Sequence, residues 1–361
     1  MPNRYEKLNR IEYLDLAKGI VMLIVVYHHT RLIPLPVQII YHPFFMSFFF
    51  LISGFFYSHK EPGKYFKGKA YSLLLPYVIW RTIFSVIEFA RDMVRNGLTA
   101  TVVTGGLKNW GLGLLAIKSP LSSGPTWFFI CLFLVSAIYY FVDSIPVSNK
   151  GKACVVAGVT MVGIIINECT AIDLPFKLIN ALVVLPVFYF GVLVKQSSRD
   201  GKCAIFTMNR ILTLLMIAVY VGLSIVHYEL CGNTVSVTAN VYYYYPLFYI
   251  NAILGSVCVI NLCGSINIGK AREKVPHVIN VIECGSIYSG VLLCIHNPVD
   301  GAFRVLFRHL PGFSTLRYFY AVIIALIVFT VLSLFAKSIS RTQFRVLFGI
   351  SKKKQIAQQK N

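Results

Sequence analysis

Residues 14–30 read LDLAKGIVMLIVVYHHT, and this stretch decides the class of protein. It is apolar enough to enter a membrane, yet it carries Asp15, Lys18, His28 and His29. A membrane-spanning helix needs roughly 20 predominantly apolar residues. Segments of that kind recur along the 361-residue chain, of which 57% is hydrophobic and only 13% charged. The sequence therefore predicts one integral membrane protein, in which ionisable residues inside the spans need a functional or structural reason.

Ten segments have the hydropathy of a transmembrane helix. They cover residues 13–33, 38–57, 71–90, 124–143, 153–169, 177–195, 210–228, 242–263, 279–298 and 317–337. The predicted fold class is thus all-α, a polytopic membrane bundle of about ten transmembrane helices. With both termini on the cytoplasmic side, the inner segments hold 23 Lys and Arg residues and the outer segments hold 9. Because basic residues favour the cytoplasmic side, we predict cytoplasmic termini and a multi-pass location in the cell (plasma or inner) membrane.

The net charge of +20 first suggests a nucleic-acid partner. The basic residues, however, fall in short clusters between apolar segments and form no stripe interleaved with aromatic side chains. This distribution excludes nucleic acid and is typical of membrane topology, so membrane lipids are the expected partners of the basic segments. No Cys or His spacing typical of a metal site is present. The sequence leaves the oligomeric state open.

Lys18 and His29 share one face of the first predicted helix. They are eleven residues apart, which at 100° per residue is about three turns plus 20°, with a rise of about 16 Å. This face presents a cation near the predicted cytoplasmic end and an imidazole in the outer half. An imidazole suits proton transfer near neutral pH. The alternative is that Lys18 reaches the lipid head groups and His29 bonds a neighbouring helix.

Two later spans also carry ionisable residues. Arg81, Ser85 and Glu88 form one stripe of the third span, for which a structural ion pair and a substrate contact both remain open. The connection after it, residues 91–123, mixes Gly, Trp and Leu as an interfacial or re-entrant segment does.

In the ninth span, His296 is expected to reach the same outer depth as His29, and Asn297 and Pro298 are expected to end the helix. Two imidazoles at one depth, on different helices, predict a functional site.

Several motifs, in order along the chain, resemble the membrane O-acyltransferases of acyltransferase family 3. The motifs are LDLAKGIVMLIVVYHH, FFMSFFFLISGFF, LLLPYVIW, GPTWFFICLFL and SGVLLCIHNPV. The first is similar to the family's opening helix, whose basic residue and essential histidine fall on Lys18 and His29. The resemblance covers a membrane domain over residues 1–340, which a basic cytoplasmic tail follows over residues 341–361.

The resemblance implies an acyltransferase of the EC 2.3.1 type that acylates cell-envelope carbohydrates. The co-substrate would be acyl-CoA, with acetyl-CoA expected, and no cofactor would be bound permanently. The acceptor would be a carbohydrate or glycolipid of unstated identity. His29 would act as general base with His296 as the second catalytic candidate, and a transient acyl-histidine is the competing route. The donor's phosphates would meet basic residues on the cytoplasmic side, for which the candidates are Lys18, Lys67 and Lys69.

Five residues are candidates for binding the acceptor: His42, Ser53, Arg81, Trp127 and Ser289. Relatives often have a histidine at the position of Phe45, and His42 lies one helical turn earlier, so whether His42 replaces it is open. Two other functions compete with the enzyme. A transporter or flippase of a glycan or lipid-linked intermediate would also use intramembrane charges, although no internal repeat is visible. The other competing function is that of a sensor protein with the same fold that has lost catalytic activity.

Overall fold

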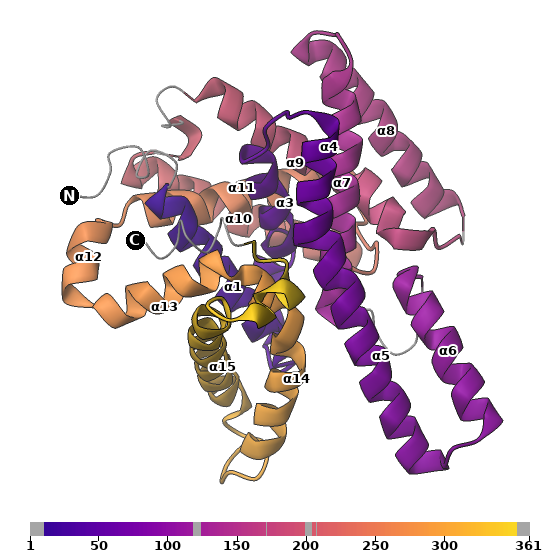
Figure 1. Cartoon of the computed structure of the whole chain (residues 1–361). Coiled ribbons are helices and arrows are strands. Elements are labelled where there is room, and N and C mark those ends of the chain that lie inside the picture. Colours follow the sequence, from indigo (N-terminus) through magenta and orange to yellow (C-terminus); the bar gives the residue numbers. More distant parts are fainter. Residues whose placement is uncertain (1–10, 118–123, 171, 199–203, 207, 352–361) are drawn as a thin grey trace. The chain divides into compact units, whose positions relative to one another are not determined.

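The computed structural model describes residues 11–117, 124–170, 172–198, 204–206 and 208–351 (Figure 1). Over these residues the regular elements are helices, with one isolated β-bridge between Ser236 and Val241. The all-α prediction is therefore confirmed. The described residues up to Tyr57 and Val187–Gln343 form a first compact unit, and Ser58–Pro186 with Phe344–Ser351 form a second.

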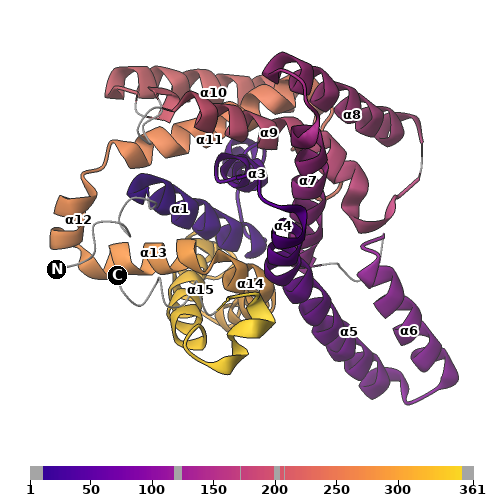
Figure 2. The same ribbon diagram turned by 45° about the horizontal axis from the view of Figure 1, so that its top comes forward.

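The first unit is built around the helix that contains the opening motif. Its helices are α1 (Glu12–His29), α2 (Leu35–Tyr41), α3 (Phe45–Phe55), α10 (Arg210–Cys231), α11 (Tyr245–Gly264), α12 (Ile268–Lys274), α13 (Pro276–Ile287), α14 (Ser289–Phe307) and α15 (Arg317–Ile339). Helix α1 packs against α13, α15, α11 and α14, and Figure 2 shows it beside α13. The apolar side chains of α1 are buried by these neighbours, which fixes the direction of its polar ones.

The second unit contains the remaining complete helices. They are α4 (Pro62–Lys69), a π-helical segment (Ala70–Leu74), α5 (Leu75–Asn96), α6 (Ala100–Leu114), α7 (Trp127–Ser144) and α8 (Asn149–Cys169). Helix α9 (Leu178–Ser197) runs from this unit into the first. The predicted interfacial connection forms the end of α5 and the helix α6, which pack together as a hairpin (Figure 1). Gly97 ends α5 with a φ of +73°, a conformation that favours glycine.

Within the described part of the chain, eight helical segments are long and apolar enough to span a membrane. They are Leu35–Phe55, Pro62–Asn96, Trp127–Ser144, Asn149–Cys169, Pro175–Ser197, Arg210–Cys231, Tyr245–Gly264 and Arg317–Ile339. A ninth arises if α13 and α14, bent by 97° at Tyr288, count as one span. The protein is thus a polytopic, multi-pass membrane bundle. Helix α1 covers the remaining predicted span, but its 18 residues include Glu12, Asp15 and Lys18, whereas each of the eight segments contains an 18-residue stretch with at most two charged residues.

The prediction that Asn297 and Pro298 end the ninth helix is wrong. Helix α14 continues through both residues to Phe307, and the chain bends instead at Tyr288. A proline inside a helix removes one backbone donor, and packing of the helix can compensate for this loss. Helix α14 is packed by α15 and α1, which keeps the segment after Pro298 helical. From residue 352 on, the predicted basic tail lies outside the described residues.

Two glycines allow α3 and α9 to approach each other closely within the first unit. A Cβ added at Gly54 would meet the backbone oxygen of Phe188, and one added at Gly191 would meet the backbone oxygen of Leu51. Small residues at such contacts are typical of helix pairs in membranes, because backbones can then touch. Gly54 of the SG motif therefore has a packing role in this structure.

Candidate active site

Four histidines form a row at one end of the first unit. His28 and His29 end α1, His42 follows the last residue of α2, and His296 lies in the middle of α14. The ring centroids of His42 and His28 are 5.0 Å apart, and those of His28 and His29 are 5.1 Å apart. The centroids of His29 and His296 are 4.5 Å apart, in an edge-to-face arrangement. Residues that are 254 positions apart in the chain, His42 and His296, thus belong to one continuous cluster.

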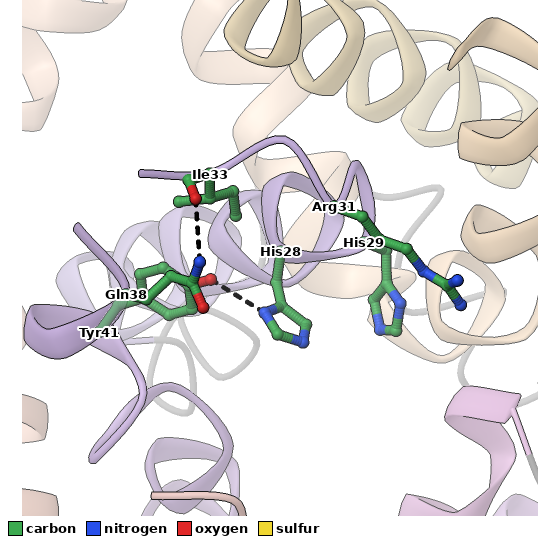
Figure 3. A pocket seen from close by; sticks show the side chains of 6 residues that line it. All are labelled: His28, His29, Arg31, Ile33, Gln38 and Tyr41. Atoms are coloured by element: carbon green, nitrogen blue, oxygen red, sulfur yellow. Dashed lines mark hydrogen bonds between the residues drawn. The ribbon is translucent and has the colours of Figure 1, made fainter. Parts of the chain in front are cut away.

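A cavity of about 360 Å³ opens beside the middle of this row (Figure 3). It is lined by His28, His29, Arg31, Ile33, Gln38 and Tyr41. Cavities of roughly 300–1,000 Å³ are typical of small-molecule sites. The lining is rich in hydrogen-bonding groups, as a site for a polyhydroxylated ligand needs to be.

Two hydrogen bonds organise the cavity wall, and both are drawn in Figure 3. Nδ1 of His28 lies 2.9 Å from the hydroxyl of Tyr41, and Nε2 of Gln38 donates to the carbonyl of Ile33 at 2.9 Å. They tie the end of α1 to α2 and to the connection between them. The hydrogen bond of His28 occupies one of its ring nitrogens.

His296 lies behind His29 and is fully buried. Its Nδ1 is 2.7 Å from the backbone oxygen of Leu292, which can only accept, so Nδ1 carries the hydrogen. The other nitrogen, Nε2, is buried and has no hydrogen-bond partner among the described residues. The Leu292 carbonyl therefore selects the tautomer whose Nε2 lone pair is available. Such a nitrogen, on a ring in contact with His29, can accept a proton or a hydrogen bond.

Polar contacts hold the other end of α1. Arg272 of α12 bridges Glu12 of α1 and Glu283 of α13, at 3.4 Å and 2.6 Å respectively. The hydroxyl of Ser286 donates to the carboxylate of Asp15 at 3.2 Å. Lys18 lies one turn beyond Asp15 and is half-buried. These contacts hold the start of α1 against α12 and α13, so the helix cannot slide along its axis. They thereby also set the position of His28 and His29 at its other end.

Of the acceptor candidates in the first unit, only His42 belongs to the histidine row. It contacts His28 and lies 5.7 Å from the ring of Phe45, while its Nδ1 is 3.0 Å from the backbone oxygen of Val235. Ser53 comes eleven residues later, near the opposite end of α3. Ser289 begins α14, seven residues before His296 and therefore about 10 Å away along the helix.

Arg81 and Trp127 belong to the second unit. Arg81 is fully buried against α6, where a Cβ added at Gly113 would overlap its guanidinium group. The hydroxyl of Tyr77, one turn earlier, lies 2.8 Å from the backbone oxygen of Gly113. These contacts favour the structural interpretation of Arg81. Trp127 begins α7 and is 4% exposed, so it also belongs to a packed region.

The two other predicted donor contacts differ in their surroundings. Lys67 is exposed on α4. The ammonium group of Lys69 donates to the hydroxyl of Ser136 at 3.2 Å and lies 5.7 Å from the ring centroid of Tyr65. Lys69 is therefore held in a defined position, as a specific anion contact requires, whereas Lys67 is free to follow solvent or head groups.

The sequence reasoning missed two residues next to the cluster, Asp300 and Arg304. They follow His296 at intervals of four residues, and this spacing could have predicted that all three share one face of a helix. Ending the helix at Pro298 placed both in a loop and hid this spacing. His28 was not among the predicted site residues, because neighbouring residues of a helix lie about 100° apart around its axis. In the structure, the rings of both His28 and His29 line the cavity.

A comparison with known proteins identifies the family. The model of the family described as an acyltransferase domain, acyltransferase family 3, matches residues 11–336. This match covers nearly the whole chain, so the protein belongs to that family and is a multi-pass membrane acyltransferase. No curated protein and no solved structure matches the chain.

Proposed function

We propose that this acyltransferase moves an acyl group, expected to be acetyl, from acyl-CoA to a hydroxyl of a cell-envelope carbohydrate or glycolipid, with His29 as general base. One observation carries the proposal above the others. His29 lines a cavity of about 360 Å³ and at the same time contacts His296, whose free Nε2 is the one nitrogen of that ring able to accept. A base at a cavity wall with a second base behind it suits proton transfer from a bound hydroxyl.

The reaction would proceed without a net change in protons. His29 removes the proton of the acceptor hydroxyl while the oxygen attacks the thioester carbonyl. The carbon–sulfur bond then breaks, and the departing CoA thiolate takes the proton from the imidazolium. The products are the ester and the free thiol of CoA. In the competing route the His29 nitrogen attacks the thioester first, and the acyl-histidine then passes its acyl group to the hydroxyl.

The donor's phosphates would be held by lysines. Lys18 and Lys69 are the stronger candidates, since both are half-buried on helices. Lys67 would add to the positive electrostatic potential that attracts the donor's phosphates, without a fixed contact to them. The acceptor candidates His42, Ser53, Arg81, Trp127 and Ser289 stay predictions, of which His42 is supported best because it belongs to the histidine row.

The proposal is tested by CoA release from acetyl-CoA in membranes of cells that express the chain, because these membranes contain the natural acceptor. His29→Ala is expected to lower the rate by about 100-fold or more, the usual contribution of a general base. His277→Ala is the matched control, since His277 is an exposed histidine at the start of α13. Turnover by folded His29→Ala protein at the rate of the control would refute the proposal.

A mass increase of 42 Da on envelope glycans, dependent on His29, would identify the acyl group as acetyl and point to the acceptor. The same spectra from cells without the gene provide the baseline.

A further inference from the structure

A second polar stripe lies against the catalytic end of α1. His296, Asp300 and Arg304 follow one another on α14 at intervals of four residues, so their side chains share one face of the helix. At one end of the stripe, His296 contacts the ring of His29. At the other end, Nη1 of Arg304 donates to the backbone oxygen of Thr30 at 3.2 Å. Asp300 lies between these two contacts, and His29 and Thr30 are neighbours in the chain.

Asp300 is fully buried, and neither carboxylate oxygen has a hydrogen-bond partner among the described residues. A buried carboxylate without such partners is costly, and no packing need explains it. An Asn of the same size would fill the same space at lower cost. The ionisable carboxyl group is therefore the property that needs an explanation, and its ionised form is stabilised when a cation forms close by.

The surroundings of Asp300 are otherwise basic. Among the described residues, the titratable or charged groups near the cavity and the stripe are the four histidines of the row, Tyr41, Arg31 and Arg304. Asp300 is the one carboxylate on α2, α3 and α14, all of which lie within the described residues. A positive charge that forms on His29 would thus meet neutral imidazoles and the two guanidinium groups of Arg31 and Arg304, and Asp300 is the group of opposite charge.

We infer that Asp300 is the counter-charge of the His29–His296 pair. It is a positioning residue: it stabilises the imidazolium that forms when His29 takes the acceptor's proton, and it neither accepts that proton nor touches the reacting atoms. The proton still passes from the hydroxyl to His29 and on to the CoA thiolate. This inference rests on the proposed function and adds to it the residue that makes His29 an effective base.

The expected size follows from the helix spacing. Residues at i and i+4 have their Cβ atoms roughly 5–6 Å apart. The ring of His29 lies a further 4.5 Å from that of His296, so the separation of the charges is roughly 6–10 Å. At that separation and an effective dielectric constant near 20, loss of the charge should slow the chemical step by about 10-fold to 100-fold. Two other roles predict different results. If Asp300 only neutralised the guanidinium of Arg304, its loss would have no effect on the rate once Arg304 was also replaced. If Asp300 bound an acceptor hydroxyl, its loss would raise the concentration of acceptor that the reaction needs.

The experiment measures CoA release in the same membranes over a range of acetyl-CoA concentrations. Asp300→Asn is expected to lower the maximal rate by about 10-fold to 100-fold, with the KM for acetyl-CoA unchanged, and Asp300→Glu should restore part of the rate. Glu229→Gln, at an exposed carboxylate of α10, is the matched control and should stay within about twofold of the wild type.

Arg304→Gln and the double variant Asp300→Asn/Arg304→Gln separate the roles. If Asp300 serves the histidines, the double variant is about 10-fold to 100-fold slower than Arg304→Gln alone. Equal rates of these two variants would overturn the inference, and so would recovery of Asp300→Asn on addition of acceptor glycan extracted from the membranes. Gel filtration in detergent checks folding. If Asp300→Asn does not fold, the double variant decides, because it also removes the half-buried guanidinium that Asp300→Asn leaves without its counter-charge.

The outcomes also separate this inference from the proposed function. CoA release that does not depend on His29 would overturn both. Release that depends on His29 but is unchanged in Asp300→Asn would overturn the counter-charge alone.

Discussion

The contact between α3 and α9 gives a prediction whose size can be worked out from the structure. Replacing Gly54 by Ala puts a Cβ against the backbone of Phe188, 2.8 Å from its carbonyl carbon and 3.2 Å from its Cα. Ordinary contacts begin at 3.4 Å, so the two helices must move apart by at least 0.6 Å. No rotamer change can relieve this contact, because the opposing atoms belong to the backbone.

Two terms set the expected free energy. Overpacking costs about 1–3 kcal/mol, and a contact with rigid backbone belongs at the upper end. Alanine in a helix interior gains about 1 kcal/mol over glycine. The net loss for Gly54→Ala is therefore about 2 kcal/mol. Gly222 of α10 is the matched control, because a Cβ there meets nothing within 4 Å. Gly222→Ala keeps the helix-propensity gain of alanine without the overpacking cost. The free energies of unfolding of the two variants should therefore differ by about 3 kcal/mol.

The assay is thermal unfolding of the purified variants in one detergent. Gly54→Ala should unfold at a lower temperature than the wild type, and Gly222→Ala at the same or a higher temperature. Gly191→Ala, on the other side of the same contact, should follow Gly54→Ala. If Gly54→Ala were as stable as Gly222→Ala, the close approach of these helices would be refuted.

Two further changes test the ends of α1. Lys18→Ala should raise the apparent KM for acetyl-CoA and leave the maximal rate near that of the wild type, because the charge acts on donor binding; an unchanged KM would detach Lys18 from the donor. Arg272→Gln breaks the bridge between Glu12 and Glu283, but Arg272 is 46% exposed. The loss of unfolding free energy should therefore stay below about 1 kcal/mol and shrink in high salt. A larger loss that salt does not change would show that the bridge is not an exposed ion pair.

Much of the fold could be read from the chain because its signals are local. Hydropathy over windows of helix length places the spans, and α1, with Lys18 and His29 on it, follows from residues 12–29 alone. The order of short motifs also identified the family. Pro298 shows where local reasoning fails, because a proline ends a helix in isolation but not where packing against other helices holds the chain.

What the sequence determined by itself is a polytopic helical membrane protein of acyltransferase family 3, with a cation and an imidazole on its first helix. The tertiary structure alone decided that His42, His28, His29 and His296 form one row, and that α14 continues past Pro298 so that Asp300 shares a helix face with His296. The physical reason is that helix periodicity sets which face a residue occupies, whereas packing between helices distant in the chain sets what that face meets. A catalytic site depends on the packing between helices, because proton transfer needs groups in contact.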